Sequence, residues 1–189
     1  MALCVNACSG PLLSHQTTPC STRLGDIRSI IFITCKEVFD QIAADPENPA
    51  SWEDITIPAN NVGNANGVIV NDLQIERTSE ISFVERFVSD GTENNSDGVT
   101  YTLNILDQSI SCENNEFWRS LNGRNSFVAL FYNDGRMEIS EVQFPFYTAM
   151  PSATKNTVQT YSIEASKKFP ISKSWICVEN APVLPGINF

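Results

Sequence analysis

The residues that could carry catalysis are few in this 189-residue sequence. His15 is the single histidine, so a Ser-His-Asp or Cys-His site would depend on this one side chain. It lies in a stretch with no helical or strand period, where nothing predicts a scaffold that would hold a general base. Residues 64–67 (NANG) lack the Lys and the Ser or Thr of a phosphate-binding loop. The sequence therefore favours a protein that is not an enzyme, and no cofactor is expected.

Cysteine is the other residue type with chemical reach, and the chain has six. Zinc could take soft ligands from His15 and from the cysteines of the N-terminal part, which are Cys4, Cys8, Cys20 and Cys35. Their spacings do not match the paired Cys-x-x-Cys pattern. No metal site is therefore predicted, and zinc is kept as an alternative.

The start of the chain bears on the redox state of these cysteines. Residues 1–22 carry no Lys or Arg, and Pro11 interrupts their modest apolarity, so we expect no signal peptide. The chain would then fold in a reducing cytoplasm, where Cys35, Cys112 and Cys177 remain thiols and serve as small apolar residues. The longest apolar run, residues 30–33 (IIFI), is far shorter than a membrane span of about 20 residues, so no membrane segment is expected.

Paired carboxylates, which glycoside hydrolysis requires, are available at Glu113 and Glu116 and at Glu138 and Glu141. Nothing in the sequence marks either pair as desolvated and opposed. We therefore interpret these carboxylates as surface charges.

The charges of the chain are numerous and unevenly spread. The net charge is −10, which argues against a surface that binds nucleic acid as a whole. Residues 76–141 hold 12 acids against 5 arginines and no lysine. Residues 151–175 hold four lysines against the single acid Glu164; the lysines are Lys155, Lys167, Lys168 and Lys173. Opposite-sign patches on one chain favour self-association, and two independently solvated surfaces are the alternative.

The elements that would position these groups are mostly strands. Residues 26–35 alternate with Ile27, Ile31, Ile33 and Cys35 on one face and apolar residues on the other, which predicts a strand covered on both sides. A helix is expected at 36–44, strands at 52–58 and 68–75, and a flexible loop tip between them at 60–67 (NNVGNANG). These two short strands and their tip predict a projecting hairpin.

A central block at 78–143 follows. We expect strands at 78–89 and 99–106 separated by the turn-rich residues 90–98, and a helix at 113–121 that ends at Asn122-Gly123. Strands at 126–132 and 136–143 are joined by Asn133-Asp134-Gly135, a strong hairpin signal. After an irregular connection at 144–147, the last two strands are expected at 157–166 and 174–179.

These elements predict one domain of a mainly β class. The expected fold is an antiparallel β-sandwich or rolled sheet with one flanking helix, at residues 23–179. Residues 1–22 and 180–189 have no clear period and are predicted to be extended arms that contact neighbouring chains. The apolar arm residues that would make those contacts are Leu3, Val5, Leu12, Leu13, Val183, Leu184, Ile187 and Phe189.

The central block is similar to a known family in its order of elements. An acidic strand (SEISFVERFVSDGTENNSDG) precedes an alternating strand (VTYTLNIL) and a short helix with Trp and an Asn-Gly stop (ENNEFWRSLNGR). A buried strand and an Asn-Asp-Gly hairpin close the block (NSFVALFYNDGRMEISEV). This order resembles tail-tube-like virion proteins of phages that infect Bacteroidetes, including ring proteins of crAss-like phage tails.

The resemblance implies a structural protein of the virion, assembled in the host bacterial cytoplasm. Six or twelve copies would form a ring in the neck or tail around a DNA channel and join other neck and tail proteins. A projecting loop would contact the next ring, and the chain offers for it Asn60, Asn61, Gly63, Asn64, Asn66 and Gly67. The four lysines would form a basic interface. The acids expected to line the channel, where they would repel DNA phosphates, are Glu80, Glu85, Glu138 and Glu141.

Another function fits a β-rich acidic chain. A head decoration, baseplate or adhesion module would bind the capsid or a cell-surface glycan instead. Closed rings in solution would favour the first function, and a stable monomer or trimer the second.

Overall fold

A computed structural model describes residues 26–55, 66–88, 91–109, 111–149 and 160–187. The described part is mainly β, with two α-helices and one 3-10 turn. In chain order the elements are β1 (Ile27–Ile33), α1 (Lys36–Ala44), η2 (Pro49–Trp52), β2 (Gly67–Val88), β3 (Gly91–Asp107), α2 (Cys112–Leu121), β4 (Asn125–Tyr132), β5 (Met137–Ser140), β6 (Phe144–Ala149), β7 (Tyr161–Phe169) and β8 (Trp175–Val178).

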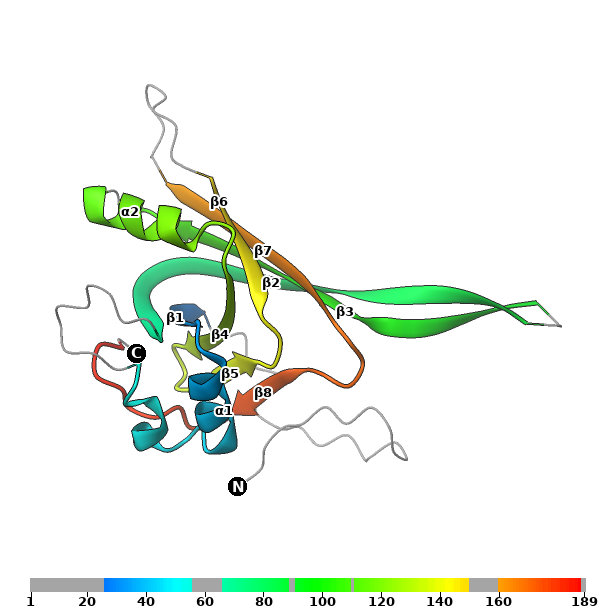
Figure 1. Cartoon of the computed structure of the whole chain (residues 1–189), viewed down its shortest axis with the longest axis horizontal. Helices are drawn as coiled ribbons and strands as arrows, with labels where there is room; N and C mark the ends of the chain where they lie inside the picture. Colours follow the sequence, from blue (N-terminus) through cyan, green and yellow to red (C-terminus); the bar gives the residue numbers. More distant parts are fainter. Residues whose placement is uncertain (1–25, 56–65, 89–90, 110, 150–159, 188–189) are drawn as a thin grey trace.

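Six strands close into an antiparallel barrel (Figure 1). Their order is β1-β2-β3-β7-β6-β4, and the pairing of β4 with β1 completes the circle. β5 pairs with β4 and β8 pairs with β5, so these two short strands extend the sheet beyond the barrel. The mainly β class is confirmed, and the sheet closes into a barrel rather than a sandwich. The helices expected at 36–44 and 113–121 are both present, although the predicted architecture had one flanking helix.

The alternation of β1 separates two hydrophobic cores. Ile30 and Phe32 point into the barrel, whereas Ile31 and Ile33 point outward. The predicted two-sided burial is confirmed, but Ile27 was assigned to the wrong face. The pairing register shifts between Ile27 and Ser29, and this bulge turns Ile27 into the barrel with Ile30.

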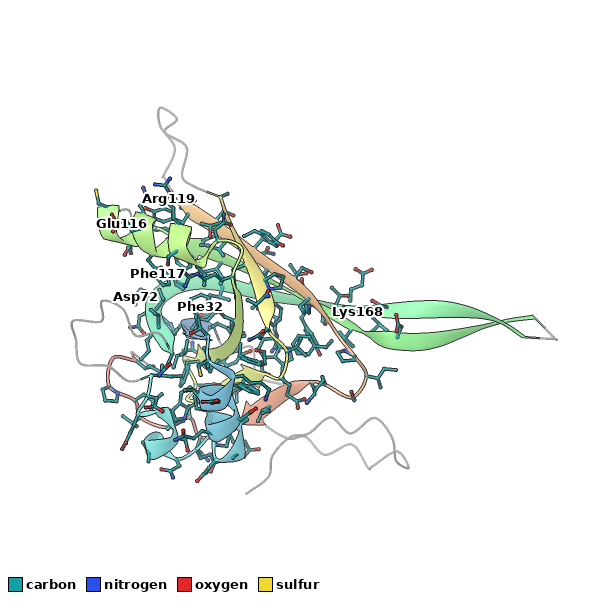
Figure 2. All side chains as sticks on the ribbon, viewed as in Figure 1. Phe32, Asp72, Glu116, Phe117, Arg119 and Lys168 are labelled. Atoms are coloured by element: carbon teal, nitrogen blue, oxygen red, sulfur yellow. The ribbon has the colours of Figure 1, made fainter. Side chains whose placement is uncertain are left out.

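Aromatic side chains fill the barrel interior, and α2 adds Trp118 to them. Phe32 meets Phe146 at a ring distance of 5.0 Å and Trp118 at 6.1 Å. The Trp118 indole N–H donates to Asp107 Oδ2 at 2.7 Å, so this buried polar atom has a partner. The helix therefore packs into the barrel core through Phe117, Trp118 and Leu121. Figure 2 labels Phe117 near Phe32, and the two ring centroids lie 6.1 Å apart.

The ends of α2 explain its position. The Ser111 hydroxyl accepts from Asn114 N at 3.0 Å and caps the first turn. At the other end Gly123 adopts a φ of +76° and its N–H donates to the Phe146 carbonyl at 2.8 Å. The helix end is thereby fixed to β6. Residues 144–147, which were expected to be irregular, form most of this strand.

A second core lies outside the barrel, over β1, β4 and β5. Phe39 of α1 stacks on Phe127 with ring centroids 3.9 Å apart, and Trp52 of η2 meets Phe131 at 6.0 Å. Trp52 lies in a 3-10 turn and not in the strand predicted at 52–58. Its indole N–H donates to the Pro46 carbonyl at 3.0 Å, which holds the turn against the helix.

The segment at 180–187 folds back onto this second core. Leu184 is buried, and Ile187 packs beside it. Asn71 Nδ2 donates to the Gly186 carbonyl at 2.7 Å. Leu184 and Ile187 are thus part of the domain and not of an arm, whereas Val183 is 81% exposed. Phe189 and residues 1–22, including Leu3, Val5, Leu12 and Leu13, lie outside the described residues.

One cysteine differs from the expectation of free thiols. Cys177, in β8, is disulfide-bonded. The other two described cysteines, Cys35 and Cys112, are free. No helix in the described part of the chain is long and apolar enough to cross a membrane.

We predict that Trp118→Phe lowers the free energy of unfolding by about 2–4 kcal/mol, because it leaves a small cavity and removes the hydrogen bond to the buried Asp107 Oδ2. Urea unfolding followed by circular dichroism measures the loss. Tyr147→Phe is the matched control, because that tyrosine is 61% exposed and its hydroxyl should contribute less than about 0.5 kcal/mol. Equal effects of the two changes would contradict a structural role for Trp118.

Candidate assembly surfaces

The longest pairing in the molecule joins β2 and β3, which run together from Gln74↔Leu106 to Val88↔Gly91. The barrel strands on either side stop earlier. β1 leaves β2 at Ile75, and β7 leaves β3 at Val99. Residues 82–88 and 91–98 therefore form a two-stranded ribbon, which Figure 1 shows extending away from the barrel. In the described part of the chain no strand pairs with either outer edge of this ribbon.

Such a ribbon has little stability of its own. Seven strand residues at about 3.4 Å each carry it roughly 20 Å beyond the barrel. An isolated two-stranded hairpin is at best marginally stable in water, and unpaired edges present a row of N–H and C=O groups to any incoming strand. The ribbon is therefore the part of the fold with most to gain from a partner.

Three features fix the ribbon where it leaves the barrel. The register shifts between Ser82 and Phe83, which gives β3 an extra residue at Asp97. Gly98 adopts a φ of +133°, and a Cβ there would lie 2.1 Å from the Phe169 carbonyl oxygen. Lys168 of β7 forms an ion pair with Asp97 (Figure 2). The bulge and the close approach at Gly98 set the direction of the ribbon.

A polar face lies on the outside of β2, β3, β7 and β6. Residues at neighbouring positions form rows across the strands, such as Thr78, Thr102 and Ser166. The next row joins Glu76, Asn104, Glu164 and Tyr147. These side chains are exposed or half-buried, and none of the described helices packs over them. The barrel therefore presents one broad, largely polar surface next to the ribbon.

The predicted channel acids divide between exposed and buried sites. Glu80 is exposed on the polar face, together with Glu76 and Glu164, which our sequence analysis did not select. The alternation of Glu76, Thr78 and Glu80 along one strand could have placed Glu76 on the same face as Glu80. Glu141 instead accepts from Ser174 N at 2.6 Å and from Lys173 at 3.2 Å. Nothing is described for the side chain of Glu85.

Glu138 lies in a buried polar cluster and is no candidate for a channel surface. It pairs with Arg77 of β2 and accepts from the Tyr132 hydroxyl at 2.6 Å. The Arg77 guanidinium also lies 4.8 Å from the ring centroid of Trp175. Burial raises the pKa of Tyr132 well above its usual value, and the nearby Glu138 carboxylate adds to this effect. The cluster connects β2, close to the ribbon, with β4, β5 and β8.

Three of the four lysines of the predicted basic patch lie in the described part of the chain. Lys167 and Lys168 are exposed on β7, and Lys173 lies in the connection to β8. Lys168 forms an ion pair with Asp97, and Lys173 forms one with Glu141. Lys155 lies outside the described residues.

Only two residues of the predicted projecting loop, Asn66 and Gly67, lie in the described part of the chain. Gly67 is buried at the start of β2, and a Cβ there would lie 2.7 Å from the Phe32 carbonyl oxygen. Asn66 accepts from Thr34 N at 3.0 Å. Both residues lie beside the barrel strands, and the projection that the structure describes is the ribbon of residues 82–88 and 91–98. Asn60, Asn61, Gly63 and Asn64 lie outside the described residues, so their role stays a prediction.

Of the five possible metal ligands, one lies in the described part of the chain. No group of three His, Cys, Asp or Glu residues there could hold a metal ion. Cys4, Cys8, Cys20 and His15 lie outside that part, and Cys35 is a free thiol.

Comparison with known proteins gives a distant structural likeness. No family model matches the chain. No curated protein matches it either. The fold is similar to a chain in a structure described as the tail of an empty GTA particle, obtained by helical refinement with C6 symmetry. The two are 13% identical, the match covers 59% of this chain and 87% of that one, and the TM-score is 0.34. This similarity assigns neither a family nor a function.

Gly98→Ala should cost more stability than Gly123→Ala. Both glycines have positive φ, but an added Cβ meets the Phe169 carbonyl at residue 98 and nothing within 4 Å at residue 123. We expect a loss of about 1 kcal/mol at residue 123 from backbone strain alone and at least twice that at residue 98. Denaturant midpoints of the two variants measure the difference. Equal midpoints would show that the backbone contact at the ribbon base is not restrictive.

The stability of the protein should fall as the pH rises above about 10, because the unfolded chain then releases the Tyr132 proton while the folded chain retains it. The slope from one such group is at most about 1.4 kcal/mol per pH unit. Tyr132→Phe should lower stability at neutral pH by about 1–3 kcal/mol through the lost hydrogen bond, and should flatten the alkaline slope. Urea unfolding between about pH 8 and 11 tests this. A slope that is unchanged in Tyr132→Phe but reduced in Tyr147→Phe would refute it.

Proposed function

We propose that this chain is a non-enzymatic structural protein of a phage virion. In this proposal copies form a homo-oligomeric ring, six- or twelve-fold, in the neck or tail around the DNA channel, and the ring joins neighbouring tail proteins. The observation that carries the proposal is the ribbon, a two-stranded extension of a closed barrel with both outer edges unpaired in the described chain.

Barrel closure supports an assembly role for the ribbon in particular. Closure pairs β1 with a neighbour on each side, whereas in the described part of the chain the outer edge of β2 is unpaired from Glu76 onward and both outer edges of the ribbon are unpaired. Strand addition to an exposed edge is a common way for proteins to bind one another, because main-chain hydrogen bonds supply affinity. A ring satisfies every copy with the same contact.

The polar face supplies a surface suited to a channel. It carries Glu76, Glu80 and Glu164, and its only described lysine, Lys168, is paired with Asp97. A surface with an excess of acid repels phosphate and gives DNA no sites at which to bind while it passes. We therefore place this face toward the channel, with Glu76 and Glu164 replacing Glu138 and Glu141 among the proposed lining acids.

Removing the ribbon tests this function directly. Because Ile81 pairs with Val99, residues 82–98 can be replaced by a two-residue Asn-Gly turn that suits an antiparallel hairpin. We expect the wild-type chain to form rings visible by negative-stain electron microscopy, and the shortened chain to remain a folded monomer by light scattering and circular dichroism. A ring formed by the shortened chain, or a wild-type chain that stays a monomer or trimer, would contradict the proposal. The latter result would favour a decoration or adhesion module.

A further inference from the structure

Hydroxyl groups surround Lys168 on the polar face, and Figure 2 labels this lysine beside the base of the ribbon. Lys168 of β7 is paired opposite Thr100 of β3, and Ser166 lies two residues earlier on the same face. Thr102 is paired opposite Ser166 and donates to its hydroxyl at 3.1 Å. Because Ser166 is the acceptor in this bond, its own proton remains available to a further acceptor. Lysine and serine or threonine side chains are common donors to DNA phosphates, so this group could contact one.

The bulge of β3 brings one acid to this lysine. Residues 82–98 contain four acids, which are Glu85, Asp90, Glu93 and Asp97. In a regular strand Asp97 would share a face with Val99, which pairs with Phe169 of the barrel core. It would then point away from Lys168. The register shift at the ribbon base leaves Asp97 outside the β2–β3 ladder, and its carboxylate forms an ion pair with Lys168.

The ion pair lies on the surface of the polar face. Gly98 leaves room for it, because a Cβ there would lie 3.5 Å from Lys168 Cε, so the lysine side chain passes over this residue. The side chains of Asp97 and Lys168 are 46% and 43% exposed. An ion pair with this exposure adds little to stability, because water competes for both charges. Its larger effect is on the charge that the face presents to a ligand.

We propose that the Asp97 carboxylate occupies the place that a DNA phosphate would otherwise take on Lys168 and Ser166. Carboxylate and phosphate oxygens both accept charge-assisted hydrogen bonds from an ammonium group. The bulge holds the carboxylate in contact, whereas a phosphate must arrive from solution. This inference rests on the proposed channel and names the residue that prevents DNA from adhering to its wall. In a ring the site is repeated in every copy, so without Asp97 the lysines would form a circle of cations around the DNA.

Substitution of Asp97 tests this masking in the full-length, assembled protein. Asp97→Asn should bind a fluorescein-labelled DNA duplex about tenfold more tightly than the wild type, or better, at about 0.05 M NaCl, and the gain should disappear towards about 0.2 M. Fluorescence anisotropy measures both affinities. Adding Lys168→Gln to Asp97→Asn should return the affinity to the wild-type value. Glu116→Gln is the matched control, because it removes the same charge from an exposed position on α2, away from the polar face. It should leave DNA binding unchanged.

The outcomes separate this inference from the ring proposal. Tighter DNA binding by Asp97→Asn, reversed by Lys168→Gln and absent in Glu116→Gln, would support the masking. Asp97→Asn rings that bind DNA no better than the wild type, or an equal gain in Glu116→Gln, would overturn the masking and leave the ring proposal intact. If Asp97→Asn forms no rings, Asp97→Ser is the second variant, and failure of both to assemble would overturn the masking in favour of a purely structural ion pair. A wild-type chain that stays monomeric at every concentration would overturn both proposals.

Discussion

The pairing of β1 with β4 is the contact on which the rest of the structure depends. It closes the barrel, and the two faces of these strands separate the aromatic interior from the second core under α1 and η2. Each strand is therefore buried on both sides, so nearly every residue must be apolar or hydrogen-bonded. Ser29 and Ser126 are the buried polar residues of these two strands. Ser29 Oγ donates to Asn71 Oδ1 at 2.6 Å, whereas the buried Ser126 Oγ has no hydrogen-bond partner in the described part of the chain. Because the pairing of β1 with β4 closes the barrel, β2 and β3 can extend beyond it as a paired ribbon while the barrel stays closed.

The parts of the fold that the sequence predicted are those with strong local or periodic signals. The two-faced alternation of residues 30–33, the helix at 113–121 with its Asn-Gly stop, and the Asn133-Asp134-Gly135 turn all describe what the structure contains. Each of these features depends on contacts within a few residues or on apolar residues that recur along one face of an element. Barrel closure depends on residues about 100 positions apart, for which a single sequence carries no signal.

The missed ribbon strand has a physical cause, because strand propensity reflects how a side chain packs in a half-buried sheet. Residues 91–98 are rich in Asn, Ser and Gly, and they predicted a turn because a strand in a core avoids such residues. In a ribbon outside the core that pressure is absent, and the same residues pair as a strand. The proline at residue 145 is typical of an irregular connection, so β6 was not predicted, although Phe144 and Phe146 both point into the core. A proline is tolerated there because it lies at the start of the strand. Glu138 was taken for a surface acid because nothing local indicates its partner Arg77, 61 residues away.

Closure by β4 also sets the order in which the chain can fold. The β2–β3 hairpin joins residues that are neighbours in sequence, so its loop closes early, whereas β1 must wait for β4, roughly a hundred residues later, before the circle is complete. An unpaired ribbon is therefore present throughout the slowest stage of folding, when the barrel is still an open sheet. Premature strand pairing between incomplete chains is the hazard of such an interval. The four acids on the ribbon, which repel their counterparts on other incomplete chains, reduce that hazard until a finished subunit is available.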